Sequence, residues 1–183
     1  AGFEANIIEN HDQPRGASLF IPEEDYGFYS LSALATIIFC ERGLPFLYQG
    51  QEIGMSNRRW QYDEFNDLET INQYQIALKA GMSKEQALEI AGHHSRDNAR
   101  TPMQWSSEEN AGFSKGKPWM PVNENYKVVN VAEEEKEYGS ILNFYKRLIA
   151  FYKSEEYNEI LTYGDFRPMY KKEDHIFAYS RSY

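Results

Sequence analysis

A histidine, an aspartate and an arginine lie close together near the start of the chain. His11 and Asp12 come soon after a short apolar run, residues 5–8, and Arg15 follows. A side chain that titrates near neutral pH, a fixed negative charge and a bidentate cation form a set that can bind and polarise a polar ligand. The structural alternative is that Asp12, followed by Pro14, caps the start of a helix and has no chemical role. Spacing alone leaves both interpretations open.

The elements that would position these residues are readable from hydrophobic patterns. The run at 5–8, stopped by a proline and a glycine, predicts a buried strand that leads into a loop. A buried helix is predicted over residues 29–42, and a second short strand over residues 44–48. Strand, helix and strand in this order predict a βαβ unit with neighbouring parallel strands. Chemistry in such sheets is found at the carboxyl ends of the strands, which is where His11 and Asp12 stand.

A polar stretch follows the second strand and continues to about residue 105. Helices are predicted around residues 67–80 and 83–91, the second because a serine and a glutamine three residues apart form a capping box. His93 and His94 are adjacent, so they cannot share a metal from one helical face as an i, i+4 pair would. They are therefore interpreted as loop or core histidines.

The last third of the chain is predicted in three parts. Residues 112–130 are rich in glycine and proline, which indicates an ordered loop without regular structure. Residues 133–152 carry apolar side chains at three- and four-residue spacing, which predicts one helix. Residues 160–183 alternate and contain turn residues, which predicts antiparallel strands.

Composition excludes several classes of partner. The 19 basic and 28 acidic residues give a net charge of −9, which argues against nucleic acid or an anionic membrane. Cys40 is the single cysteine, so a disulfide framework and a thiolate metal cage are excluded. No apolar run approaches the roughly 20 residues of a membrane helix, and no signal-peptide pattern is visible, so a cytoplasmic location is expected. The aromatic share of 15% suits either a sugar-binding surface or an aromatic core.

Four ordered stretches resemble one enzyme family. Residues 9–15 resemble the fourth conserved region of the α-amylase superfamily, glycoside hydrolase family 13. Residues 45–55, 95–105 and 112–119 follow in the order of that family and point to its oligo-1,6-glucosidase and α-glucosidase branch. The resemblance covers nearly the whole chain.

The resemblance implies an α/β fold that is part of a (β/α)8 barrel. Residues 1–157 would form the C-terminal segment of the catalytic barrel, with strands seven and eight, their helices and the long loop after strand eight. Residues 158–183 would begin a C-terminal antiparallel β domain. Two parallel strands with open edges leave backbone groups uncovered, so self-association of the chain is expected.

The resemblance also implies roles for individual residues. Asp12 would be the carboxylate that grips sugar hydroxyls next to the reacting carbon, with His11 donating a hydrogen bond beside it. Arg96 would hold the same sugar, and Glu69 the neighbouring one, although a glutamate on a helix is more often a solvated charge. The nucleophile and the general acid would lie on earlier strands, so the chain alone should be inactive. No cofactor is expected and no metal is assigned.

Several residues keep an alternative interpretation. Arg96 and Asp97 could pair to brace their loop, in which case Arg100 would face the ligand. Glu52 is expected to support the backbone of its own loop. Arg15 is expected to pair with a carboxylate in a part of the barrel that this chain lacks.

The proposed substrate is a short oligosaccharide, and several rival activities remain. Trehalose-6-phosphate hydrolase and sucrose-isomerising enzymes share these motifs closely. The sequence departs from the branch at residues 16–22 and at Gln51, so it does not identify the subgroup or the glycosidic linkage that is hydrolysed. A non-catalytic relative, such as the barrel-bearing heavy chain of amino-acid transporters, is opposed by the presence of His11 and Asp12. A free-standing carbohydrate-binding module is opposed by the lack of an independent β sandwich.

Overall fold

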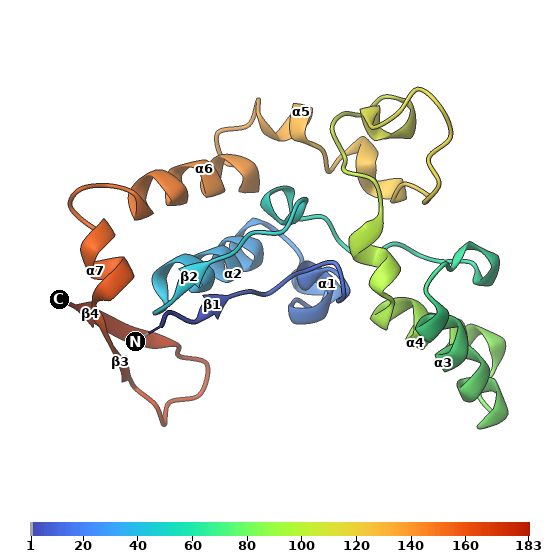
Figure 1. Cartoon of the computed structure of the whole chain (residues 1–183), viewed down its shortest axis with the longest axis horizontal. Helices are drawn as coiled ribbons and strands as arrows, with labels where there is room; N and C mark the ends of the chain where they lie inside the picture. Colours follow the sequence, from blue (N-terminus) through green and yellow to red (C-terminus); the bar gives the residue numbers. More distant parts are fainter. Residues whose placement is uncertain (1) are drawn as a thin grey trace.

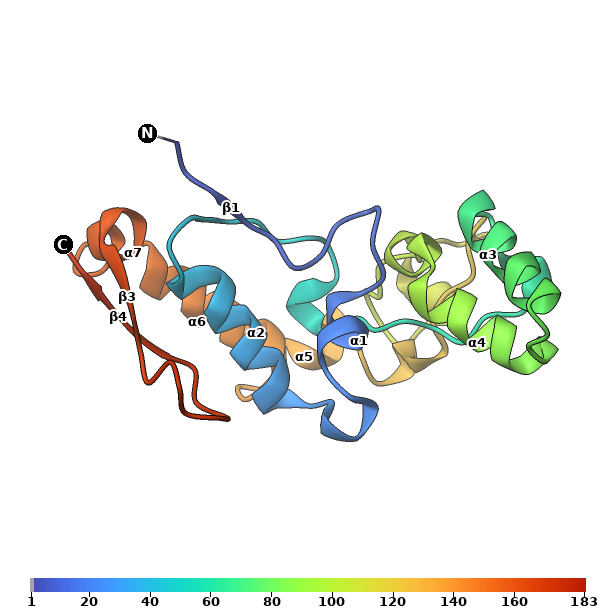
Figure 2. The same cartoon turned by 90° about the horizontal axis from the view of Figure 1, so that it is seen from below.

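The computed structural model describes residues 2–183 as an elongated α/β chain (Figure 1). A helical hairpin lies at one end and a β hairpin, which leads to the C-terminus, lies at the other (Figures 1 and 2). The helices and strands are β1 (Ala5–Asn6), α1 (Gly16–Phe20), α2 (Phe28–Cys40), β2 (Leu44–Pro45), α3 (Leu68–Lys79), α4 (Lys84–His94), α5 (Val131–Glu134), α6 (Ile141–Tyr152), α7 (Asn158–Tyr163), β3 (Asp165–Met169) and β4 (Ala178–Ser182).

The predicted strand, helix and strand unit is confirmed as β1, α2 and β2. The two strands are parallel, with Ala5 opposite Leu44 and Asn6 opposite Pro45. The strands are shorter than predicted, because each has one partner only and Pro45 has no N–H to donate. The Asn6 side chain donates to the carbonyl of Ile38 (3.0 Å), which ties β1 to the crossover helix.

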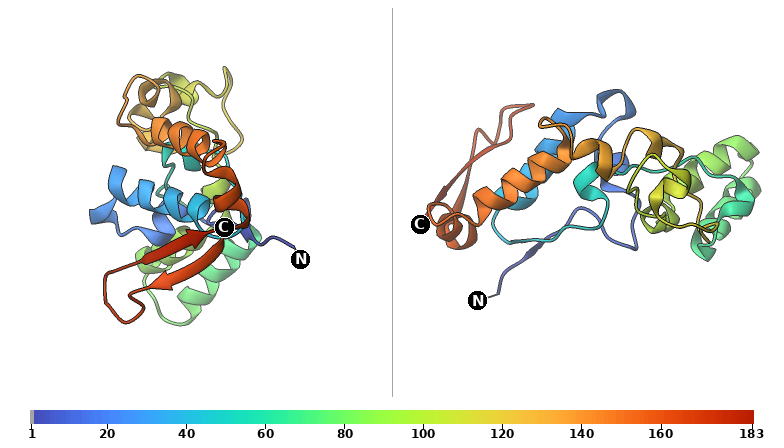
Figure 3. Two further views of the ribbon diagram at one scale, coloured as in Figure 1. Left: turned by 90° about the vertical axis from the view of Figure 1, so that its left-hand side faces the viewer. Right: turned by 90° about the horizontal axis from the view of Figure 1, so that it is seen from above.

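Helix α6 packs along α2 and closes the main core (Figure 3). The core consists of buried apolar side chains from these two helices: Ala35, Ile38, Phe39, Ile141, Tyr145 and Leu148. The rings of Phe39 and Tyr145 meet edge to face with centroids 6.3 Å apart. This layer supports β1 and β2 from one side.

The single helix predicted over residues 133–152 is wrong, because the chain breaks between α5 and α6. Ser140 caps α6 by accepting a hydrogen bond from the amide of Asn143 (3.2 Å), and the carboxylate of Glu134 accepts from the amide of Leu142 (3.0 Å). The start of α6 is therefore fixed by side chains that stand outside the helix. Apolar spacing alone did not reveal this boundary.

The long polar region forms a lobe around the α3–α4 hairpin. The capping box is confirmed: Ser83 accepts from the amide of Gln86, whose side chain accepts from the amide of Ser83 (both 3.2 Å). A small core of Trp60, Phe65 and Met120 lies beside the hairpin. The loop predicted over residues 112–130 contains one short 3-10 turn, Glu124–Lys127, and a second such turn, Glu109–Gly112, ends at its first residue.

The C-terminal part begins with a helix, not with a strand. Residues 158–163 form α7, so the prediction of strands from residue 160 is wrong at its start, and the antiparallel pair β3–β4 follows. Arg181 donates to the carbonyls of Cys40, Leu161 and Gly164 (2.9 Å each), which joins the hairpin to the ends of α2 and α7. A domain boundary between residues 157 and 158 stays a prediction.

The architecture is α/β, and residues 2–183 form no closed barrel. Each of the two sheets that are described has two strands. Apolar side chains along the parallel pair are exposed, among them Phe3, Ile7, Leu44 and Phe46. None of the helices in the described part of the chain has the length and apolar content that crossing a membrane requires.

Candidate active site

The loop after β1 presents His11 and Asp12 to solvent. The Asp12 amide donates to the side chain of Asn10 (2.8 Å), and the imidazole of His11 lies 3.2 Å from the Asp12 carboxylate. Their side chains are 71% and 54% exposed, so both can reach a ligand. Helix α1 begins after Arg15 and has no side-chain cap, so the alternative in which Asp12 caps a helix is wrong.

The fully buried side chain of Arg15 holds this loop in place. Its guanidinium lies 3.2 Å from the carboxylate of Glu9, and both side chains are 1% exposed. It also donates to the carbonyls of Gln49 (2.7 Å) and Asn98 (3.2 Å), which belong to the loops that follow β2 and α4. The prediction that Arg15 pairs outside this chain is wrong, because Glu9 of the same loop supplies the carboxylate.

The loop after β2 is supported as predicted. The Glu52 carboxylate accepts from the amide of Gly50 (2.8 Å), and the Gln51 side chain donates to the hydroxyl of Tyr145 on α6 (2.9 Å). Gly50 has φ +90°, a conformation that glycine adopts without steric cost. The Glu52 side chain therefore supports the backbone of this turn, and the Gln51 side chain joins the turn to α6.

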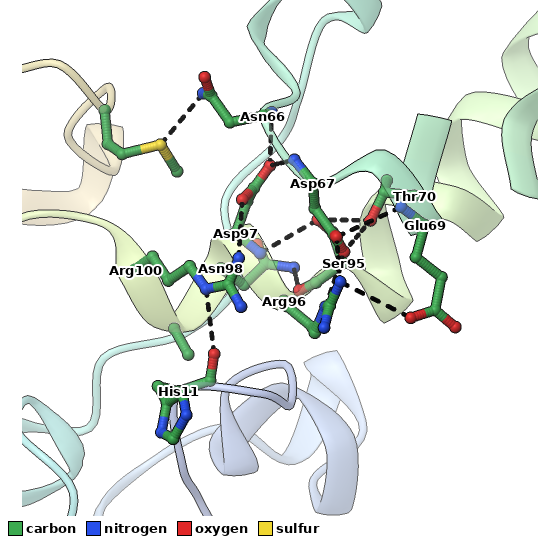
Figure 4. A network of polar contacts seen from close by, with 12 residues as sticks. His11, Asn66, Asp67, Glu69, Thr70, Ser95, Arg96, Asp97, Asn98 and Arg100 are labelled. Atoms are coloured by element: carbon green, nitrogen blue, oxygen red, sulfur yellow. Dashed lines mark hydrogen bonds and ion pairs between the residues drawn. The ribbon is translucent and has the colours of Figure 1, made fainter. Parts of the chain in front are cut away.

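The 3-10 segment Arg96–Arg100 supplies two arginines to the site (Figure 4). Arg96 binds the carboxylate of Asp67 with two nitrogens, Nε to Oδ2 (3.1 Å) and Nη2 to Oδ1. Burial raises the pKa of Asp67, but hydrogen bonds from Arg96, Thr70 and the amide of Glu69 together lower it to about 2. The pair is therefore ionised at neutral pH. Asp97 does not brace Arg96, so that alternative is wrong.

Arg100 connects this segment to the loop of Asp12. Its Nη2 donates to Oδ1 of Asp12 (3.0 Å) and its Nε donates to the carbonyl of His11 (3.1 Å). Nη1 of Arg96 lies 3.8 Å from the same Asp12 oxygen, beyond hydrogen-bond distance. Both guanidinium groups thus lie next to the Asp12 carboxylate. Arg100 uses two of its N–H donors in hydrogen bonds to the loop of His11 and Asp12.

The other predicted residues lie at different distances from this centre. The Glu69 carboxylate is 3.8 Å from Nη2 of Arg96, and its side chain is 63% exposed. His93 and His94 are the last two residues of α4 and are exposed, so their interpretation as loop or core histidines is wrong. The geometry brings together Asp12, His11 and Arg96, with Glu69 at the edge.

Two buried carboxylates that organise the site were not anticipated. Asp97 accepts hydrogen bonds from the amides of Asn66 (2.8 Å) and Asp67 (2.9 Å), and so joins the start of α3 to the 3-10 segment. Asp67 caps α3 by accepting from the amide of Glu69 (3.3 Å). An acidic residue before a predicted helix signals a cap, but no sequence signal indicated that Arg96 would be its partner.

The fold and the polar cluster define a class: α/β chains with polar side chains gathered at the carboxyl ends of parallel strands, the place where such folds carry their chemistry. The chain belongs to the family described as "Alpha amylase, catalytic domain", which it matches over residues 1–164. It is thus a member of glycoside hydrolase family 13, as the resemblance predicted.

Curated relatives include glucosidases from bacteria and yeast. The chain is 41% identical to the oligo-1,6-glucosidase of Bacillus cereus over 184 residues, which is 100% of this chain and 32% of that protein. It is 38% identical to the α-glucosidase of Candida albicans over 186 residues, covering 96% of this chain and 32% of that protein. The chain therefore spans about a third of the length of the curated relatives it matches.

Solved structures of related enzymes also match almost the whole chain. A variant of the Bacillus licheniformis trehalose-6-phosphate hydrolase superposes with a TM-score of 0.91 at 40% identity, covering 99% of this chain and 32% of that chain. The trehalulose synthase of Pseudomonas mesoacidophila MX-45 superposes with a TM-score of 0.84 at 37% identity, covering 96% and 32%. The partial α/β architecture is therefore shared with chains about three times as long.

Proposed function

We propose that this chain is a segment of a retaining α-glucosidase that hydrolyses short α-glucosides, with oligo-1,6-glucosidase-like activity. One observation carries the proposal. Asp12 is an exposed carboxylate at the carboxyl end of a parallel strand, with the guanidinium groups of Arg100 and Arg96 directed at it. Membership of the family and the glucosidases among its relatives support this proposal.

The carboxylate would act on the transition state and not on the bond itself. Retaining glycosidases use a nucleophile and a general acid around an oxocarbenium-like transition state. Asp12 would accept hydrogen bonds from the sugar hydroxyls beside the reacting carbon, and these bonds strengthen as positive charge develops on the ring. His11, which lies 3.2 Å from Asp12, would donate a hydrogen bond to the same sugar. The nucleophile and the general acid would be supplied by the rest of the enzyme.

Arg96 and Glu69 would bind substrate around this centre. Arg96 is held by Asp67, but its side chain remains 33% exposed, so the outer nitrogen can donate to a hydroxyl. Glu69 is more exposed and 3.8 Å from Arg96, which suits a neighbouring sugar. Strands β1 and β2 would be the seventh and eighth strands of a (β/α)8 barrel, and residues 158–183 the start of its C-terminal β domain.

Two other activities on glucosides are second candidates. The likeness to a trehalose-6-phosphate hydrolase favours one of them, and the likeness to a trehalulose synthase favours a sucrose isomerase. The substrates of the three activities differ in the group that is joined to the glucose. Assaying the enzyme that carries this chain on isomaltose, sucrose and trehalose 6-phosphate would separate them.

The decisive experiment places this chain in the corresponding stretch of the Bacillus cereus enzyme, which it matches over 184 residues. The grafted enzyme should hydrolyse a chromogenic α-glucoside, and Asp12→Asn should lower kcat by about 10²–10³-fold. Asp63→Asn, an exposed carboxylate on a neighbouring 3-10 turn, is the matched control and should change little. A folded graft without activity, or one in which Asp12→Asn is harmless, contradicts the proposal.

The isolated chain should behave differently. Purified residues 1–183 should not hydrolyse the chromogenic substrate, and measurable turnover would contradict the assigned roles. The exposed apolar side chains along β1 and β2 favour self-association of the isolated chain. We expect the complete enzyme to act in the cytoplasm. Sedimentation should show a mass that grows with concentration, and a monomer at high concentration would oppose this.

A further inference from the structure

The pair formed by Asp67 and Arg96 is asymmetric in its exposure. The Asp67 side chain is 3% exposed, whereas the Arg96 side chain is 33% exposed. Two parallel hydrogen bonds, from Nε and from Nη2, join them (Figure 4). A planar guanidinium held by two of its nitrogens cannot rotate about its own axis, so the direction of its third nitrogen is fixed.

Asp67 is itself fixed from three directions. Its carboxylate accepts from the hydroxyl of Thr70 (2.9 Å) and from the amide of Glu69 (3.3 Å). Its amide donates to the buried carboxylate of Asp97 (2.9 Å). The hydroxyl of Thr70 also bonds Ser95 (2.9 Å), directly before Arg96 in sequence. The carboxylate is therefore a rigid support, built before any ligand binds.

The nitrogen that Asp67 leaves free is the one that faces the centre of the site. Nη1 of Arg96 lies 3.8 Å from Oδ1 of Asp12, too far for a direct hydrogen bond and close enough for both atoms to bind one hydroxyl group. An arginine carries about 2 kcal/mol of side-chain rotamer entropy. Immobilising the side chain in advance removes that cost from binding.

We propose that Asp67 is a positioning residue, which holds Arg96 so that Nη1 is aimed at the sugar hydroxyl bound by Asp12. This inference rests on the proposed function and adds to it the residue that sets the geometry of the sugar ligand. Asp67 touches no substrate and acts through Arg96 alone. The opposing interpretation is that the pair only braces the loop, in which case its loss changes stability and not substrate binding.

The first measurement uses the grafted enzyme described above, in which the rest of the fold is present. In ¹⁵N spectra of the arginine side chains, the Nε–H of Arg96 should exchange with solvent slowly, and Asp67→Asn should accelerate that exchange by about tenfold or more. Thr70→Val is the structural control, because it removes a hydrogen bond from Asp67 but leaves both bonds to Arg96. It should destabilise the lobe and leave the Arg96 signal protected.

The second measurement uses the grafted enzyme described above. Asp67→Asn should raise KM for a chromogenic α-glucoside by about tenfold or more and change kcat by less than about threefold, because Arg96 binds the sugar in the ground state as well. Thr70→Val, which removes one support of Asp67 but keeps its bonds to Arg96, should raise KM by less than Asp67→Asn does. Asp63→Asn, which carries the same chemical change at an exposed position, should leave both constants unchanged.

The outcomes separate this inference from the function on which it rests. If the unmodified graft folds and does not turn over substrate, the proposed function fails, and this inference fails with it. If the unmodified graft is active but Asp67→Asn leaves KM and the Arg96 exchange rate unchanged, the positioning role alone is overturned. If Asp67→Asn raises KM without accelerating the exchange of the Arg96 Nε–H, the effect does not pass through Arg96 and the inference is wrong.

Discussion

Replacing Arg15 with methionine tests how the loop of Asp12 is held. Methionine fills a similar volume without a charge, so the substitution isolates the loss of the guanidinium. Glu9, which is 1% exposed, would lose its ion-pair partner Arg15, and the carbonyls of Gln49 and Asn98 would lose a donor. Breaking a buried pair from one side costs about 3–5 kcal/mol, since the remaining carboxyl must stay buried as an uncompensated charge or take up a proton. We expect Arg15→Met to lower the free energy of unfolding by that amount.

The double variant Glu9→Gln with Arg15→Met separates charge from packing. Glutamine carries no charge, so the double variant should recover about 2 kcal/mol of the loss. Burial already raises the pKa of Glu9 despite the neighbouring Arg15, and removing Arg15 raises it further. When a carboxyl has a higher pKa in the folded state than in the unfolded state, the free energy of unfolding of the protein falls as pH rises. The loss of stability caused by Arg15→Met should therefore be smaller at pH 5 than at pH 8.

Urea unfolding followed by tryptophan fluorescence measures these differences. Trp60 is 4% exposed and donates to the side chain of Asn98 (2.7 Å), whose carbonyl accepts from Arg15, so it reports on the affected region. Arg59→Met, at an exposed arginine, is the matched control and should stay within about 0.5 kcal/mol. A loss below about 1 kcal/mol for Arg15→Met, or one equal at both pH values, would refute the reasoning.

Three further substitutions test other parts of the fold. Arg181→Leu removes the donor that reaches the Cys40 carbonyl, and should speed amide exchange in the β3–β4 hairpin; unchanged exchange would show that the hairpin holds without it. Burial raises the pKa of Glu134 to about 7, so the unsubstituted chain should lose stability as pH rises from about 4.5 to 7. Glu134→Gln should therefore gain about 1 kcal/mol after screening relative to the unsubstituted chain over that range, and a stability difference that does not change with pH in urea unfolding would contradict this. Ser83→Ala should cost about 1 kcal/mol and some helical circular dichroism, and full helicity would argue against the cap.

The chain order of the site was readable from sequence, because local chemistry determines it. A short apolar run, a polar turn with His11 and Asp12, and a helix before a second strand are properties of neighbouring residues. The capping box at Ser83 is equally local, and it is present where the sequence predicts it. Family membership followed from four such stretches in order.

Boundaries and partners were decided by contacts between distant residues. The predicted helix over residues 133–152 fails because Glu134 folds back to cap α6, which periodicity does not encode. Arg15 meets Glu9 within its own loop, a pairing that depends on how the turn closes. Sequence patterns show which residues are apolar, but they do not show which charged side chains a turn brings into contact with each other.

The sequence by itself determined the kinds of residue at the site and their order along the chain. The tertiary structure alone decided that Arg96 is held by Asp67, 29 positions away, while Arg100 holds Asp12, 88 positions away. The physical reason is that a guanidinium takes whichever carboxylate the folded backbone places within about 3 Å. The same residue types in the same order would allow either pairing, and only the path of the polar lobe selects one of them.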